Sequence, residues 1–335
     1  MALGPRALCC VGSLISLLAT GCPQFQQKPR SGLDVREYVE IGRERIFVKD
    51  RGEGPVVVLI HGYCGSSDHW SKLVPALVKT HRVLAVDLPG FARSDKYAGD
   101  YSPDAMAARL FRLLELKGVT KAHLVAHSWG TSIALAMALQ QPRRVASVTL
   151  IGVWAYEDQL PPYIVWSRAP GVGEVLFTLF FDQRLDDRMG LTFHDVDAHI
   201  DPGSIERARA TLALPGHLAT ALAAVRGMRF GEMERRYATL PQRFLILHGE
   251  HDPVTRLPWA RRLDRELPDS RLVLIPDAKH MAMYTQAPKV LRALRPFLAG
   301  LEPGQAVVPR RPPAPAPATM PAAPAPSASA PAVTP

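Results

Sequence analysis

A serine between a strand and a helix is the first group in this chain that could carry chemistry. Ser128 stands at the centre of AHSWG, which follows the apolar run 123–125 and precedes the helix-forming run 133–139. Such a turn strains the backbone of its central residue, so small residues are needed two positions before and two positions after it. Ala126 and Gly130 meet this requirement. The pattern therefore predicts a nucleophilic hydroxyl at a strand end, where a base and a substrate can reach it.

Two further residues could activate this serine. Asp252 follows the strand-like run 243–247, and His280 follows a second such run at 271–275. Because the carboxyl ends of parallel strands lie at one edge of a sheet, the three side chains are expected to converge there. A histidine can take the serine proton, and a carboxylate can hold the imidazole in the useful tautomer. The order serine, acid, histidine therefore predicts a triad of Ser128, Asp252 and His280.

The order of these segments resembles the α/β-hydrolase superfamily over residues 34–300. VVVLIHGY at 56–63 is similar to a strand and its His-Gly oxyanion turn, and residues 83–95 are similar to the next strand and its loop. The resemblance implies an α/β-hydrolase fold, with a mostly parallel central sheet flanked by helices. It also implies that the backbone amides of Tyr63 and Trp129 form the oxyanion hole.

The position of the acid has two solutions within this superfamily. Some members place it after the strand that here corresponds to 147–151, which would select Glu157 or Asp158 instead of Asp252. Other polar residues near the motifs are expected to be structural or to line the pocket: His61, His127, Asp87, Asp95 and Cys64.

The chain is expected to form one sheet domain with one insertion. Its 335 residues, 47% of them hydrophobic, can bury one large core, and the strand-then-helix alternation argues for a single sheet. We expect the α/β-hydrolase core at 34–154 and 237–300. Between these parts, residues 155–236 show helical stretches broken by prolines and glycines, which predicts a helical cap inserted after the sixth strand.

Many side chains of the predicted cap are apolar. They either pack the cap onto the sheet domain or line the cleft, and in the second case the acyl or alcohol part of the substrate is apolar. Both uses disfavour a purely polar substrate such as a sugar ester. The residues are Tyr163, Ile164, Val165, Trp166, Val175, Leu176, Phe177, Leu179, Phe180 and Phe181.

The first 21 residues have the pattern of a secretion signal. One charge, Arg6, precedes the apolar run 7–19, which is shorter than the roughly 20 residues that a spanning helix needs. The run ends in LATGC, which resembles the bacterial lipoprotein box, whose cysteine becomes the lipidated first residue. The resemblance implies a signal peptide at 1–21 and export to the bacterial cell envelope. It also implies a lipid anchor at Cys22 on the periplasmic or surface side, with 22–33 as a tether. Cleavage without lipidation is the alternative.

Residues 301–335 contain eleven of the chain's 31 prolines, many of them alternating with alanine. This composition cannot build a packed core, so we expect an extended, disordered tail outside the fold. The formal charge of +9 is spread along the chain without a recognition motif, which argues against nucleic-acid binding.

Together these features predict a serine hydrolase that cleaves esters with apolar acyl or alcohol groups through an acyl-enzyme. The expected partners are a small apolar ester and the membrane that holds Cys22, and no metal or organic cofactor is expected. The same triad could instead transfer the acyl group, cleave amides or peptides, or hydrolyse carbon–carbon bonds. A non-catalytic, membrane-anchored binding module is the alternative from a different class.

Overall fold

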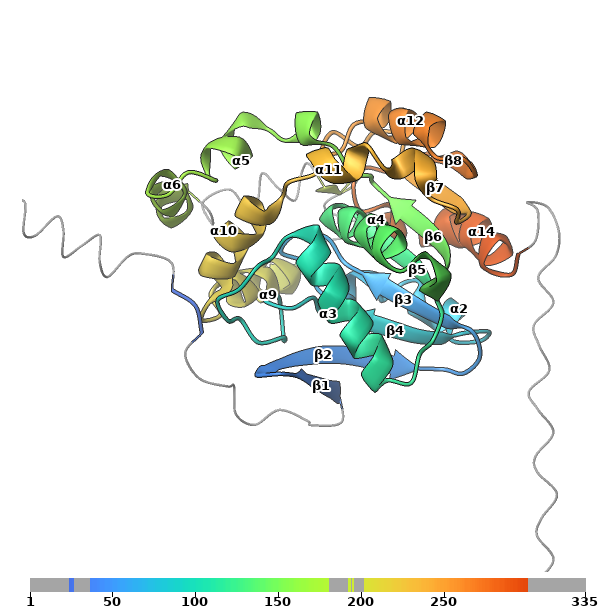
Figure 1. The fold of residues 1–335 in the computed structure, drawn as a ribbon, viewed down its shortest axis with the longest axis horizontal. Coiled ribbons are helices and arrows are strands. Elements are labelled where there is room, and N and C mark those ends of the chain that lie inside the picture. Colours follow the sequence, from blue (N-terminus) through green and yellow to red (C-terminus); the bar gives the residue numbers. More distant parts are fainter. Residues whose placement is uncertain (1–23, 27–36, 181–191, 194, 196–201, 301–335) are drawn as a thin grey trace, which may run out of the picture.

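An eight-stranded sheet organises the part of the chain that the computed structural model describes, which is residues 24–26, 37–180, 192–193, 195 and 202–300 (Figure 1). The strand order is β1-β2-β4-β3-β5-β6-β7-β8. Strand β2 is antiparallel to both β1 and β4, and all the other pairs are parallel. The strands are β1 (Tyr38–Ile41), β2 (Glu44–Arg51), β3 (Val56–Ile60), β4 (Arg82–Val86), β5 (Ala122–His127), β6 (Val145–Ile151), β7 (Phe244–Gly249) and β8 (Ser270–Ile275).

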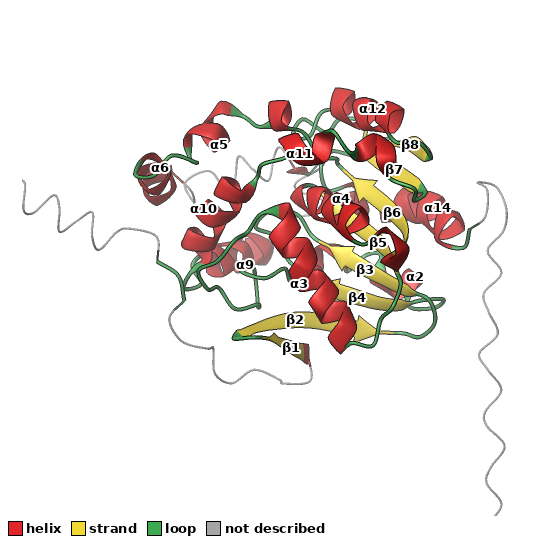
Figure 2. Ribbon diagram, viewed as in Figure 1, coloured by secondary structure: helices red, strands yellow, loops and turns green. Residues whose placement is uncertain are grey.

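Helices cover both faces of this sheet (Figure 2). Residues of α3, α4 and α12 join the core on one face, and residues of α13 and α14 join the core on the other. The helices outside the region between β6 and β7 are α2 (Val74–Leu77), α3 (Pro103–Leu116), α4 (Trp129–Gln140), α12 (Leu257–Glu266), α13 (Ala282–Thr285) and α14 (Ala287–Leu298).

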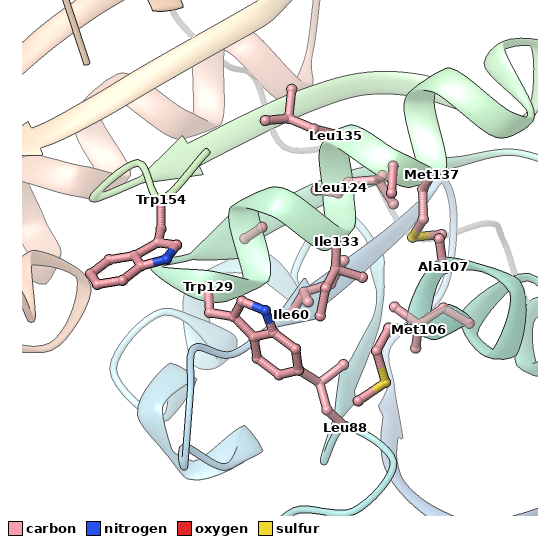
Figure 3. Packing of buried hydrophobic residues seen from close by; sticks show 14 of the residues in the cluster. Ile60, Leu88, Met106, Ala107, Leu124, Trp129, Ile133, Leu135, Met137 and Trp154 are labelled. Carbon is pink, nitrogen blue, oxygen red and sulfur yellow. The ribbon is translucent and has the colours of Figure 1, made fainter. Parts of the chain in front are cut away.

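Cover on both faces explains why the central strands are continuously apolar instead of alternating. In β3, Val58 and Ile60 belong to one core cluster, whereas Val57 and Leu59 belong to the other. Helix α4 is buried almost all round, and its first residue, Trp129, packs in the same cluster as Ile60 (Figure 3). The sheet edge that carries the candidate site is therefore fixed from both sides.

The described residues between β6 and β7 form helices and no strand. They lie over the carboxyl ends of the central strands and include α5 (Pro162–Trp166), α6 (Val172–Phe180), α9 (Pro202–Leu212), α10 (His217–Gly227) and α11 (Gly231–Glu234). The cap is held together by polar as well as apolar contacts, because Arg226 of α10 pairs with Glu174 of α6 at 2.7 Å. No helix among the described residues has the length and apolar character needed to cross a membrane.

Part of the expected tether lies against the core. The backbone N–H of Gln26 donates to the carbonyl of Lys96 at 2.9 Å, and its side chain donates to Asp95 at 3.2 Å. The N–H of Lys96 donates back to the side-chain oxygen of Gln26 at 3.2 Å. Residues 24–26, which belong to the expected tether, are therefore fastened to the domain by these hydrogen bonds.

Candidate active site

The serine turn has the strained backbone that its sequence predicts. Ser128 lies between the end of β5 and the start of α4, with φ of 53° and ψ of −128°. A positive φ is costly for a residue with a Cβ, and it persists only where the surroundings fix it. Here the Ser128 N–H donates to the carbonyl of Ile151 in the neighbouring strand at 2.9 Å. The side chain of Ser128 is therefore displayed at the sheet edge, with the residue 7% exposed.

Gly130 is required by the close approach of α4 to β3. A Cβ at this position would lie 2.5 Å from the carbonyl oxygen of His61 and 2.7 Å from that of Ile60. Ala126, at the matching position before the serine, is fully buried, and it belongs to the core cluster on the face of the sheet that α4 covers. The turn thus tolerates a methyl group on the strand side, whereas the helix side has no room for one.

Gly130→Ala is expected to destabilise the fold by about 2–3 kcal/mol, because backbone atoms, which cannot rotate away, occupy the new methyl position. Urea unfolding measures this loss. Gly231→Ala is the matched control, since nothing lies within 4 Å of a Cβ there and the change should stay within about 0.5 kcal/mol. Equal stability of the two variants would contradict the packing argument.

The predicted acid and base are in contact. The Nδ1 atom of His280 lies 2.9 Å from Oδ2 of Asp252. The same carboxylate oxygen accepts from the Thr255 hydroxyl at 2.7 Å, while Oδ1 accepts from the N–H groups of Val254 and Thr255 at 2.8 and 3.1 Å. Burial alone would raise the pKa of Asp252, but the charge and hydrogen bond of His280 and the Thr255 hydroxyl hold that pKa well below its usual range.

An ionised Asp252 fixes the tautomer of its neighbour. A carboxylate only accepts hydrogen bonds, so Nδ1 of His280 must carry the proton. In the neutral imidazole, Nε2 then carries the lone pair, and this is the tautomer that can take a proton from a hydroxyl.

The Asp252–His280 pair lies at the same edge of the sheet as the serine turn. His127, the residue before Ser128, packs its ring on that of His280 with 4.5 Å between the ring centres. Its Nε2 also lies 3.0 Å from the His280 carbonyl oxygen. Gly152 follows Ile151, whose carbonyl accepts from the Ser128 N–H. A Cβ on Gly152 would lie 3.2 Å from Nδ1 of His280 and 3.3 Å from Oδ2 of Asp252. Ser128, Asp252 and His280 therefore share one edge of the sheet.

Gly152 and the contact between His127 and His280 are features that sequence reasoning missed. Gly152 has φ of 60° and directly follows β6, where the Asp252–His280 pair needs room. A glycine directly after an apolar strand at the same sheet edge was the available signal.

The predicted oxyanion turn lies against the serine. A Cβ on Gly62 would lie 2.8 Å from the Cβ of Ser128. Tyr63 follows this glycine, and its hydroxyl donates to the carbonyl of Ala221 in the cap at 3.0 Å. Trp129 is the first residue of α4, so its N–H is among the donors that a helix leaves unused. The two predicted donor residues therefore flank Ser128 on different elements.

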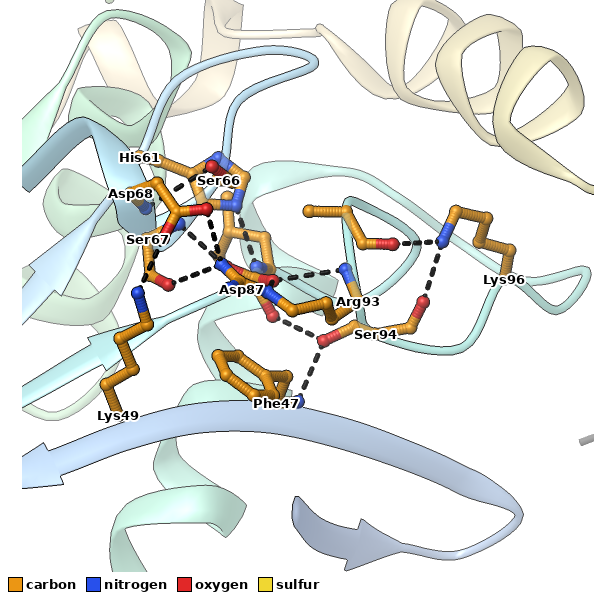
Figure 4. Close-up of polar contacts among 12 residues, drawn as sticks. Phe47, Lys49, His61, Ser66, Ser67, Asp68, Asp87, Arg93, Ser94 and Lys96 are labelled. Carbon is orange, nitrogen blue, oxygen red and sulfur yellow. Dashed lines mark hydrogen bonds and ion pairs between the residues drawn. The ribbon is translucent and has the colours of Figure 1, made fainter. Parts of the chain in front are cut away.

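His61 has a structural role at this turn (Figure 4). Its Nδ1 lies 2.7 Å from the carbonyl of Gly62, and its Nε2 accepts from the N–H of Leu88 at 2.9 Å. Burial lowers the pKa of His61, so the ring stays neutral and joins two strand ends. A proton-transfer role would require one of these nitrogens to leave its partner.

Asp87 and Asp95 fasten the loop after β4. Asp87 pairs with Arg93 at 2.6 Å and accepts from the Ser67 N–H at 2.7 Å, as Figure 4 shows. Asp95 pairs with Arg45 at 3.1 Å. Both carboxylates are thus satisfied by structural partners.

The alternative acids lie in the cap. Glu157 forms an ion pair with Arg168 and accepts from the Phe230 N–H at 3.1 Å. The carboxylate that contacts His280 is that of Asp252. Among the described residues, no cluster of histidine, cysteine, aspartate or glutamate side chains is arranged to hold a metal ion.

A cleft of about 450 Å³ opens beside the acid loop. Its lining combines aromatic, aliphatic and polar residues from the start of the cap and from the segment after β7. They include Trp154, Leu160, Tyr163, Val254, Arg256 and Trp259.

Buried histidines make the fold sensitive to acid. Burial lowers the pKa values of His69, His123 and His217 to about 4. The unfolded chain takes up these protons near pH 6.5, so the contribution of each neutral ring to stability is complete above pH 6.5 and is lost as the pH falls towards 4.

We therefore expect the melting temperature to fall steadily between pH 6.5 and 4.5. Within this window, each histidine lowers the free energy of unfolding by up to about 1.4 kcal/mol for every pH unit of acidification. His217 is fully buried, so His217→Leu should make the melting temperature depend less steeply on pH. A melting temperature that is unchanged across this window would contradict the assignment.

The fold and the site define a class of hydrolases built on an open, mostly parallel sheet with its site at the carboxyl ends of the strands. A family model described as alpha/beta hydrolase fold matches residues 55–287. The chain therefore belongs to the alpha/beta hydrolase fold family, and the predicted fold class is confirmed.

Known hydrolases of two kinds are similar to this chain. The 2-hydroxy-6-oxononadienedioate/2-hydroxy-6-oxononatrienedioate hydrolase of Comamonas testosteroni is 27% identical over 266 residues, which cover 76% of this chain and 91% of the relative. The pimeloyl-[acyl-carrier protein] methyl ester esterase of Methylococcus capsulatus is 30% identical over 265 residues, covering 76% and 98%. Among solved structures, a thermophilic esterase from Thermogutta terrifontis matches with a TM-score of 0.68 and 26% identity, covering 77% of this chain and 94% of that one.

Proposed function

We propose that this hydrolase cleaves carboxylic esters with apolar acyl or alcohol groups by way of an acyl-enzyme on Ser128. The observation that carries the proposal is the placement of a strained serine and an oriented histidine–carboxylate pair at the same edge of the sheet. Two of the similar proteins are esterases by name, which supports ester chemistry.

The steps follow from the groups present. Nε2 of His280 takes the Ser128 proton as Oγ bonds to the acyl carbon. The N–H groups of Tyr63 and Trp129 stabilise the resulting oxyanion. The carbon–oxygen bond of the ester then breaks, and His280 returns the proton to the leaving alcohol. Water, deprotonated by His280, releases the acid and restores Ser128.

The surroundings of the oxyanion turn support an apolar substrate. Tyr63, Phe91 and Trp129 form edge-to-face pairs with ring centres 5.6–6.3 Å apart. Phe91 and Trp129 are fully buried, whereas Tyr63 at the predicted oxyanion turn is only partly buried. An aromatic ring beside the site favours apolar substrate groups.

Hydrolysis of carbon–carbon bonds is the second candidate. Similar chains include the Comamonas testosteroni hydrolase and a 2-hydroxymuconate semialdehyde hydrolase of a Pseudomonas strain, 28% identical over 282 residues. The same triad could catalyse this reaction, but the leaving group would be a carbon atom, which must be protonated, in place of the oxygen of an alcohol.

Substrate profiling separates the two chemistries. The full chain is assayed on p-nitrophenyl esters from acetyl to palmitoyl and, in parallel, on 2-hydroxymuconate semialdehyde. Faster turnover of medium or long acyl chains supports the ester proposal, whereas turnover of the semialdehyde alone overturns it. An added alcohol or amine shows from the products whether the acyl group is transferred to a nucleophile other than water.

We further propose that the chain is exported and anchored to an envelope membrane through lipidated Cys22. The LATGC run at the end of an apolar segment supports this. Incorporation of labelled palmitate into the wild-type chain, and its loss in Cys22→Ser, would test the anchor. Equal labelling of both chains would contradict it.

A further inference from the structure

The cap carries a concentration of exposed apolar side chains. Among the described residues, eight large apolar side chains are exposed, and six of them lie between positions 163 and 179. We call these six the cap face: Tyr163, Val165, Trp166, Val172, Val175 and Leu179. Tyr163 and Trp166 are 58% and 62% exposed.

The cap face is separate from the surface that packs the cap onto the domain. Ile164 and Phe177 are buried in the main core cluster. In α6, Val172, Val175 and Leu179 follow one another at spacings of three and four, so they share one side of the helix. An α-helix that is apolar on its outer side as well as its inner side is typical of a surface that meets another apolar phase.

The N-terminal segment enters the domain on the side of the cap. Besides its hydrogen bonds to residues 95 and 96, this segment stacks Phe25 on Tyr101 with ring centres 6.4 Å apart. A Cβ on Gly216, the N-cap of α10, would lie 2.7 Å from the N atom of Gln26. Cys22 precedes Gln24 by only two residues, which span at most about 7 Å.

Helix α10 links this entry point to the cap face. It begins beside Gln26 and, with eleven residues, is about 16 Å long. Its far half contacts α6 through the ion pair of Arg226 with Glu174 and the packing of Leu222 against Gly173. Figure 1 shows residues 24–26 and α6 on the same side of the molecule.

We propose that the cap face is a membrane-contact surface that lies on a lipid bilayer. This assignment rests on the proposed anchor at Cys22, which holds the bilayer within a few residues of Gln24. Tryptophan and tyrosine favour the boundary between headgroups and acyl chains, and valine and leucine favour the acyl region. The fastened segment fixes the orientation, so the cap faces the lipid while the opposite edge of the sheet does not.

Footprinting tests the proposal on the wild-type chain. The protein is reconstituted into vesicles of phosphatidylethanolamine and phosphatidylglycerol and exposed to hydroxyl radicals, and the Cys22→Ser chain in vesicle-free buffer serves as the reference. We expect the reactivity of Tyr163 and Trp166 to fall at least fivefold in vesicles. Leu116 and Leu274, which are exposed elsewhere at 46% and 38%, should keep theirs. Unchanged reactivity of Trp166 in vesicles overturns the proposal.

A pair of variants provides a second measurement. In the Cys22→Ser chain, Trp166→Lys with Val175→Lys should lower the vesicle partition coefficient at least tenfold, whereas Leu116→Lys with Leu274→Lys should change it less than twofold. Equal partitioning of the two variants overturns the proposal. If Trp166 is protected from hydroxyl radicals in vesicle-free buffer and this protection disappears on dilution, the cap face is a contact between copies of the chain. That result also overturns the proposal. Palmitate labelling reports on the anchor separately, so failure of one proposal is distinguishable from failure of the other.

Discussion

Ser128→Ala is expected to lower kcat by about 10⁶-fold on every substrate that the wild-type chain turns over. In serine hydrolases, loss of the nucleophile costs about as much as loss of the whole triad, because its members act as a unit. The remaining rate would come from the oxyanion donors and from binding. Labelling by a fluorophosphonate, which requires an activated serine oxygen, should disappear in the same variant.

Ser132→Ala is the matched control for this loss. Ser132 lies on the same helix, one turn further on, and its hydroxyl donates to the Trp129 carbonyl at 2.7 Å. Removing that hydroxyl should cost some stability while labelling and turnover continue. Retained turnover in Ser128→Ala would show that the reaction does not pass through an acyl-enzyme at this residue. A wild-type chain that is labelled by the fluorophosphonate but turns over none of the esters would instead favour carbon–carbon cleavage.

The strands and the serine turn were predictable because local sequence determines them. The run 56–60 is apolar at every position, which is typical of a strand covered on both faces. The turn at Ser128 needs small neighbours for steric reasons that hold in any context, so AHSWG was sufficient to place it.

Contacts between distant segments could not be predicted in the same way. Fastening of the N-terminal segment depends on the Gln26 side chain meeting Asp95 and Lys96, nearly seventy residues away. Nothing in the composition of 22–33 distinguishes such a docking from a free tether. The choice of Asp252 over Glu157 likewise depends on which strand end approaches His280.

The cap shows where hydrophobic patterning alone is ambiguous. Apolar residues at 163–179 were expected to serve packing or the cleft, and Ile164 and Phe177 are indeed buried. Trp166 of α5 and Val175 of α6 are exposed instead, because each of these helices has apolar residues on its outer side as well as on its inner side. Periodicity identifies a buried side only when the other side is polar.

Asp252→Asn has the second-largest expected effect, a fall in kcat of about 10⁴-fold with the fold retained. The reason lies in the donors around the carboxylate. Oδ1 accepts two backbone N–H groups, from Val254 and Thr255, so the amide oxygen of an asparagine must take that position. Its NH2 group then faces Nδ1 of His280, where Oδ2 accepts now.

An NH2 group at that place donates, so His280 must present a lone pair at Nδ1 and carry its proton on Nε2. The nitrogen that faces the serine can then no longer accept the Ser128 proton. The loss should therefore appear in kcat more than in KM, because substrate binding does not depend on the tautomer. Glu157→Gln is the matched control, since it makes the same chemical change at the alternative acid and removes an ion pair with Arg168. If Glu157→Gln lost as much kcat as Asp252→Asn, the catalytic acid would have to be assigned to the cap, in spite of the 2.9 Å contact between Asp252 and His280.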